Sequence, residues 1–200
     1  MAGLDKRVAL IMAASKGLGR VSAEALARSG FNLVICSRLA ASIQSAASTF
    51  QELGAEVEAV VADVANAGDL ARVFERADAR FGRLDVLVAN AGGPPPGAVT
   101  AATDVQWETA FNLTLMSAVR AMRLSVERMR SAGYGRIIVI GSSSVKQPIS
   151  GLVLSNAFRP ALVGVTKTLS QEVRVRAYRG VDGRSPPGPD HSGPGGQMDK

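Results

Sequence analysis

A turn between two expected elements carries the residue types that bind phosphate groups. The segment MAASKGLG at positions 12–19 joins a short apolar run to an amphipathic stretch, so its glycines lie where a strand leads into a helix. Glycines in such a turn let the backbone approach a pyrophosphate, and the helix N-terminus adds unpaired N–H groups and partial positive charge. We expect these contacts from Ser15, Lys16, Gly17, Leu18 and Gly19. An ordinary tight turn without a ligand is the alternative.

Two cations accompany this turn. Arg38 follows the second apolar run, where an enzyme that uses NAD carries a carboxylate for the ribose 2′-hydroxyl. Arg38 and Lys16 instead offer positive charge, and an arginine can contact a 2′-phosphate with two donors at once. The sequence therefore predicts NADP(H) as the cofactor, with a solvated Arg38 that binds no ligand as the alternative.

Short apolar runs alternate with longer amphipathic segments along the chain, which is typical of repeated βαβ units. The strands are expected at 8–12, 32–36, 57–62, 84–89 and 136–140, and the helices at 19–29, 39–53, 69–81, 103–129 and within 152–173. Parallel strands joined by right-handed crossovers form an α/β, Rossmann-type doubly wound sheet with three α/β/α layers. Its ligand site lies at the carboxyl ends of the strands.

Composition places the chain among globular proteins of one domain. The hydrophobic fraction is 46% and the charged fraction 20%, over 200 residues. We assign residues 1–173 to a dinucleotide-binding domain and residues 174–200 to an irregular tail rich in Gly and Pro. The only histidine, His191, lies in this tail and is not expected to be catalytic.

The distribution of charge and the length of the apolar runs indicate which partners and which cellular location to expect. The net charge is +6, but the arginines are scattered along the expected helices without a basic block, so we expect no nucleic-acid partner. No apolar run approaches the roughly 20 residues of a membrane helix, and the N-terminal run fits a strand better than a signal peptide. The single Cys36 excludes an internal disulfide and is expected as a buried thiol in a cytoplasmic protein.

Taken as a set, the motifs resemble the short-chain dehydrogenase/reductase family, and particularly its 3-oxoacyl-acyl-carrier-protein reductases, over residues 4–173. That family opens with Thr-Gly-x-x-x-Gly-x-Gly. Here Met12 and Ala13 take the first two places, and the two later glycines are kept. Because an alanine adds a methyl group to a crowded turn, we expect Ala13 to keep a negative φ.

Further positions match the family's site residues one by one. An acidic residue follows the third strand, an Asn-Ala-Gly turn follows the fourth, an asparagine lies in the long helix and a serine follows the fifth strand. The resemblance implies cofactor contacts from Asp63, Val64, Asn90, Ala91 and Gly92, and catalytic roles for Asn112 and Ser142.

The family's Tyr-x-x-x-Lys pair is replaced. Counting thirteen residues from the serine gives Ser155 in the tyrosine place, and Arg159 stands in the lysine place. In the family the tyrosine hydroxyl protonates the carbonyl oxygen, and the lysine lowers its pKa. A serine hydroxyl is far less acidic, whereas Arg159 keeps a charge that can hold the ribose hydroxyls of the nicotinamide. Lys146 is a candidate donor if it is buried, and an ordinary surface lysine is the alternative.

The resemblance implies an NADP(H)-dependent oxidoreductase that acts on a small-molecule carbonyl, secondary alcohol or acyl substrate, with activity impaired by the missing Tyr and Lys. A non-catalytic dinucleotide-binding protein, acting as a sensor or assembly partner, is the alternative, and an unstable fragment is the third. The family continues with further strands and a substrate lid, so we expect an incomplete C-terminal part of the sheet, explained by a truncated or frame-altered gene product. Packing of helices 103–129 and 152–173 predicts a homodimer or homotetramer.

Overall fold

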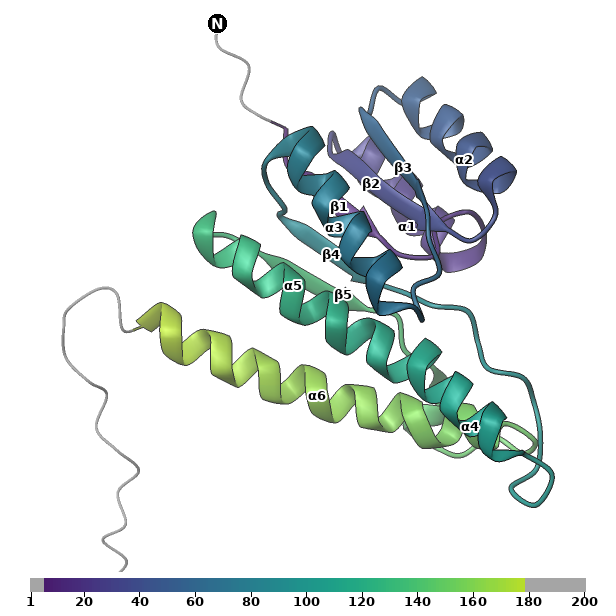
Figure 1. The fold of residues 1–200 in the computed structure, drawn as a ribbon. Coiled ribbons are helices and arrows are strands. Elements are labelled where there is room, and N and C mark those ends of the chain that lie inside the picture. The colour runs from purple at the N-terminus through teal and green to yellow at the C-terminus, as the bar shows by residue number, and fades with distance from the viewer. Residues whose placement is uncertain (1–5, 179–200) are drawn as a thin grey trace, which may run out of the picture. The chain divides into compact units, whose positions relative to one another are not determined.

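The computed structural model describes residues 6–178, with side chains to residue 173. The chain divides into two compact units, residues 1–166 and 167–200, and the sheet lies in the first. Its five strands are all parallel in the order β3-β2-β1-β4-β5 (Figure 1). They are β1 (Val8–Ile11), β2 (Asn32–Ser37), β3 (Val57–Val61), β4 (Val86–Ala89) and β5 (Arg136–Val139). The predicted doubly wound α/β fold is therefore confirmed.

Helices connect successive strands and lie on both faces of this sheet, and one more helix follows β5 (Figure 1). They are α1 (Gly17–Arg28), α2 (Ala40–Glu52), α3 (Ala67–Phe81), α4 (Asp104–Ala110), α5 (Ser117–Ser131) and α6 (Val153–Tyr178). α1 packs beside α2, and α3 packs beside α5, as expected when the crossovers reverse direction between β3 and β4 (Figure 1). Among the described residues, no helix is long and apolar enough to cross a bilayer.

The core forms because the strands are apolar on both faces. Every residue of β1, β2 and β4 is buried. Phe50 of α2 and Phe74 of α3 are fully buried. By contrast β5 lies at an edge of the described sheet, and Ile138 exposes 47% of its surface.

The predicted helix at 103–129 contains a change of helix type. Thr103 caps α4 in a reciprocal capping box, with Thr103 N donating to Gln106 Oε1 at 2.9 Å and Gln106 N donating to Thr103 Oγ1 at 3.3 Å. A π-helical turn, Phe111–Met116, then separates α4 from α5. Such turns re-aim side chains within a helix, and this one contains Asn112.

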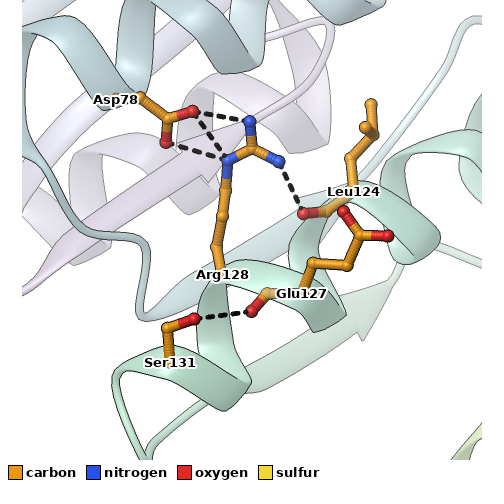
Figure 2. Close-up of polar contacts among 5 residues, drawn as sticks. All are labelled: Asp78, Leu124, Glu127, Arg128 and Ser131. Carbon is orange, nitrogen blue, oxygen red and sulfur yellow. Dashed lines mark hydrogen bonds and ion pairs between the residues drawn. The ribbon is translucent and has the colours of Figure 1, made fainter.

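An arginine holds α5 against α3. Arg128 Nη2 and Nε donate to the carboxylate of Asp78 at 2.6 and 2.8 Å, and Nη1 donates to the Leu124 carbonyl at 2.8 Å (Figure 2). The same guanidinium lies 5.1 Å from the ring centre of Phe74. Because both charged partners are partly exposed, the ion pair fixes the helix orientation more than it stabilises the fold.

α6 continues to Tyr178, past the boundary predicted at 173, while the rest of the expected tail, including His191, lies outside the described residues.

The negative φ expected for Ala13 is wrong, because this residue has φ +50°. The turn after β1 requires left-handed backbone there, and the alanine accepts a strain of about 1 kcal/mol or more.

Candidate functional site

A cleft of about 430 Å³ lies at the carboxyl ends of the strands, where the loops after all five strands meet. The predicted cofactor residues that line it are Ser15, Lys16, Gly17, Leu18, Arg38, Asp63, Val64, Asn90, Ala91, Gly92 and Arg159. Gly19, Asn112, Ser142 and Ser155 are not among the lining residues. The fold thus gathers one set of predicted residues around a single cleft and leaves the other beside it.

The glycine turn shapes the middle of the cleft. Gly19 is buried, and a Cβ added there would collide with the Ala13 carbonyl oxygen and lie 2.7 Å from Asn90 Nδ2. Only glycine therefore allows this packing, and Gly19 supports the turn from behind. Asn90 Nδ2 donates to the carbonyl oxygens of Met12 at 3.2 Å and Ala13 at 3.4 Å, which joins the turn to the loop after β4.

The N-terminus of α1 is open to an anion. No side chain caps its first turn, and that turn contains no acidic residue. Gly17, the first residue of α1, lines the cleft together with Leu18. The free N–H groups and the helix dipole therefore present partial positive charge to whatever occupies the cleft.

Two exposed cations line the cleft, one in the glycine turn and one in the loop after β2. Lys16 and Arg38 both line it, and neither side chain forms a hydrogen bond or an ion pair with the described residues. The nearby carboxylate is engaged locally, because Asp63 Oδ1 accepts from Ala65 N at 3.0 Å. Asp63 N in turn donates to Asp69 Oδ2 at 2.8 Å, and this bond, helped by Arg72, lowers the pKa of Asp69. This part of the cleft thus favours an anionic ligand.

A cluster of three serine hydroxyls lies beside the cleft. Ser144 Oγ donates to Ser142 Oγ at 3.0 Å and lies 3.3 Å from Ser155 Oγ, so one buried serine connects the two predicted catalytic serines. Ser144 N also donates to Ser142 Oγ, at 3.2 Å. Sequence reasoning missed Ser144, although its place in the run SSS after β5 was a signal that a short turn would bring alternate hydroxyls together.

The side chain of Asn112 is engaged by hydrogen bonds within its own helical segment. Its Nδ2 donates to the Glu108 carbonyl at 3.1 Å, and its Oδ1 accepts from Arg120 Nη2 at 3.2 Å. Arg120 also donates to the Ala65 carbonyl at 3.0 Å, which connects the π-helical turn to the loop after β3. The next residue, Leu113, lines the cleft in its place.

Arg159 is a buried cation at the far end of the cleft from Arg38. Only 8% of its surface is exposed, and its Nη1 donates to the Ile140 carbonyl at 2.6 Å. Its Nε is buried without a hydrogen-bond partner, and no described carboxylate forms an ion pair with it. Burial lowers the pKa of Arg159 from its ordinary value. An arginine is too basic to release its proton, so this end keeps a fixed positive charge.

Other candidates for a proton donor lie elsewhere. Lys146 is exposed at the end of the 3₁₀ turn Ser143–Val145 and does not line the cleft, as the surface-lysine alternative predicted. Tyr134 stacks with Arg7, whose guanidinium lies 4.4 Å from the ring centre, just before β5 begins. The described side chains therefore offer serine hydroxyls, and no tyrosine, beside the cleft.

Comparisons with known proteins agree with this geometry. A family model described as short chain dehydrogenase matches residues 7–180. An uncharacterised NAD-dependent oxidoreductase of Mycobacterium tuberculosis is 35% identical over 184 residues, covering 85% of this chain and 67% of the relative. L-Sorbose reductase from Gluconobacter frateurii, solved with NADPH and L-sorbose, matches with a TM-score of 0.83 and 33% identity, over 88% of this chain and 67% of that one.

A second solved structure adds a different substrate type. An actinorhodin polyketide ketoreductase with NADPH matches with a TM-score of 0.83 and 29% identity, over 88% of this chain and 68% of that one. The chain therefore spans about two thirds of the length of each of these relatives.

Proposed function

The chain belongs to the short-chain dehydrogenase family, and we propose that it binds NADP(H) and transfers hydride between the nicotinamide and a carbonyl or secondary alcohol. The observation that carries this proposal is the pair of cations, Lys16 in the glycine turn and Arg38 after β2, whose side chains line the cleft without a described partner. Two positive charges fit the 2′-phosphate that distinguishes NADP(H) from NAD(H). The NADPH in two similar solved structures supports the choice, while the name of the mycobacterial relative points to NAD.

The remaining cleft residues fit the other parts of that cofactor. The open N-terminus of α1 and the turn at Ser15–Gly17 would hold the pyrophosphate, and Asp63 with Val64 would lie along the adenine. The Asn90–Gly92 loop and Arg159 would border the nicotinamide and its ribose. When bound, the nicotinamide supplies or accepts the hydride.

The serine cluster would orient the carbonyl oxygen. Ser142 and Ser155 are held on either side of Ser144, so their hydroxyls can donate hydrogen bonds to one substrate oxygen. A serine hydroxyl is a poor acid, and loss of a general acid typically lowers the rate by roughly 10²–10⁴-fold. We therefore propose slow reduction, with 3-oxoacyl compounds as the first substrates to test.

A non-catalytic dinucleotide-binding protein is the second candidate. The observation that favours it is the hydroxyl cluster itself, which contains no group able to supply a proton readily at neutral pH. Both candidates require the same cofactor cleft, and they differ only in turnover.

One experiment separates the two. NADPH binding is titrated by its fluorescence, and NADPH consumption is followed with a panel of ketones and 3-oxoacyl esters. Binding with slow turnover supports the oxidoreductase, and binding without turnover supports the second candidate. Arg38→Asp should weaken NADPH much more than NADH, whereas the control Arg130→Asp, on the exposed last turn of α5, should change neither. An equal loss of NADPH and NADH affinity in Arg38→Asp would refute the assignment of the 2′-phosphate.

We also propose a homodimer or homotetramer in the cytoplasm, formed through the helical segments 103–129 and 152–173. Light scattering of the purified protein measures the oligomeric state directly, and a monomer at micromolar concentration would overturn the proposed assembly.

A further inference from the structure

The end of the cleft beside β5 differs in charge from the end beside β2 and β3. The strand order β3-β2-β1-β4-β5 places the loops after β2 and β3 at one end, the glycine turn in the middle and the loops after β4 and β5 at the other. The charged side chains that line the cleft are Lys16, Arg38, Asp63 and Arg159. Its one lining carboxylate therefore belongs to the loop after β3, and the β5 end carries Arg159 alone.

Arg159 keeps both its positive charge and its position in the cleft. The residue is buried, and its Nη1 is fixed to the Ile140 carbonyl at 2.6 Å. The serine side chains that α6 and the loop after β5 bring together, Ser142, Ser144 and Ser155, carry neutral hydroxyls. No negative group of the described chain compensates this charge, and its buried Nε has no partner.

The orientation of the cofactor follows from the proposed function, on which this inference rests. If the 2′-phosphate lies at Arg38 and the pyrophosphate lies at the glycine turn, the nicotinamide must extend toward the loops after β4 and β5. That end contains Asn90, Gly141 and Arg159. The oxidised nicotinamide ring carries a positive charge and the reduced ring carries none.

We propose that Arg159 makes the cleft selective for the reduced cofactor. Its fixed charge repels the oxidised ring and leaves the neutral reduced ring unaffected. Like unit charges within about 10 Å, at an effective dielectric constant near 20, change an affinity by on the order of tenfold or more. The protein would then release NADP+ readily and stay occupied by NADPH, whether it turns over substrate or only reports on NADPH.

The test compares dissociation constants for NADPH and NADP+ by isothermal titration calorimetry, with no substrate present. Wild-type protein should bind NADPH at least about tenfold more tightly than NADP+. Arg159→Met should bring this ratio close to one, mainly through tighter binding of NADP+, and Arg159→Lys should keep it. The matched control Arg38→Met should weaken both forms by the same factor, because both carry the same 2′-phosphate.

Each outcome has a distinct meaning. Adenosine 2′,5′-bisphosphate contains no nicotinamide, so unchanged binding of this compound shows that Arg159→Met keeps its fold and its adenosine end. Equal wild-type affinities for NADPH and NADP+, or an unchanged ratio in a folded Arg159→Met protein, would overturn the selectivity and leave the proposed function intact. If wild-type protein binds neither dinucleotide, the proposed function itself fails.

Discussion

Alanine at position 19 is the sharpest perturbation of the cofactor turn. Gly19 lies in the first turn of α1, where an added Cβ would collide with the backbone oxygen of Ala13 and lie 2.7 Å from Asn90 Nδ2. Overpacking of this kind costs about 1–3 kcal/mol, whereas replacing glycine by alanine within a helix otherwise gains up to about 1 kcal/mol. Because backbone cannot yield as a flexible side chain does, we expect the collision to prevail, with a net loss of about 1–2 kcal/mol.

Gly164 provides the matched control. It lies inside α6, and a Cβ added there would meet nothing within 4 Å. Gly164→Ala should therefore stabilise the protein by about 0.5–1 kcal/mol, so the same chemical change has opposite signs at the two positions. Thermal and urea unfolding measure both variants, and NADPH titration should show a clear loss for Gly19→Ala alone. If Gly19→Ala unfolds like the wild type and binds NADPH equally well, the inferred close packing of Gly19 against Ala13 and Asn90 is wrong.

Three further predictions concern buried and titrating groups. Asp85 is fully buried and accepts from Val8 N at 2.8 Å, so Asp85→Ala should leave that N–H unpaired and cost about 1–3 kcal/mol in urea unfolding; a loss below 0.5 kcal/mol would contradict this. Burial raises the pKa of Cys36 to about 11, so a thiol reagent at pH 8 should label it only as fast as the protein unfolds, and rapid labelling of folded protein would refute its burial. The pKa of Asp69 is lowered from 3.8, so its stabilising contribution is present above pH 3.8 and is lost as the pH falls through the lower pKa of the folded state. Asp69→Asn should therefore make the free energy of unfolding depend less on pH in this range. An unchanged dependence of unfolding free energy on pH would count against this prediction.

Much of the fold follows from local patterns in the sequence. Apolar runs predicted all five strands, and the reason is clearest for β1, β2 and β4, which are buried along their whole length because helices cover both faces of the sheet. The helix at 69–81 was predicted from its apolar face, and the structure extends it by two residues to Ala67, with Asn66 Oδ1 as the capping acceptor. Such boundaries depend on one side-chain hydrogen bond, which periodicity does not report.

The parts that could not be predicted depend on tertiary contacts. The turn that contains Ala13 packs against Gly19 and Asn90, and the one signal of its left-handed backbone was the glycine that the family carries at this place. The π-helical turn at Asn112 preserves apolar periodicity well enough to be read as ordinary helix. Ser144 was missed because its contacts to Ser142 and Ser155 require a 3₁₀ turn and a helix that meet only in the folded chain.

The positions of the cations along the chain were visible in the sequence, but only part of their environment could be predicted. Arg38 and Lys16 could be placed on neighbouring loops of the cleft because the ends of adjacent parallel strands lie side by side. The burial of Arg159, and the absence of an acidic partner for it among the described residues, depend on the packing of α6 against the loop after β5.

The central claim is that this cleft holds a nicotinamide dinucleotide with its 2′-phosphate between Lys16 and Arg38. Side-by-side calorimetric titration of the folded wild-type protein with NADPH and NADH tests it most directly. We expect saturable binding of NADPH at a stoichiometry of one per chain, and markedly weaker binding of NADH. Absence of heat with both compounds, or tighter binding of NADH, would contradict it.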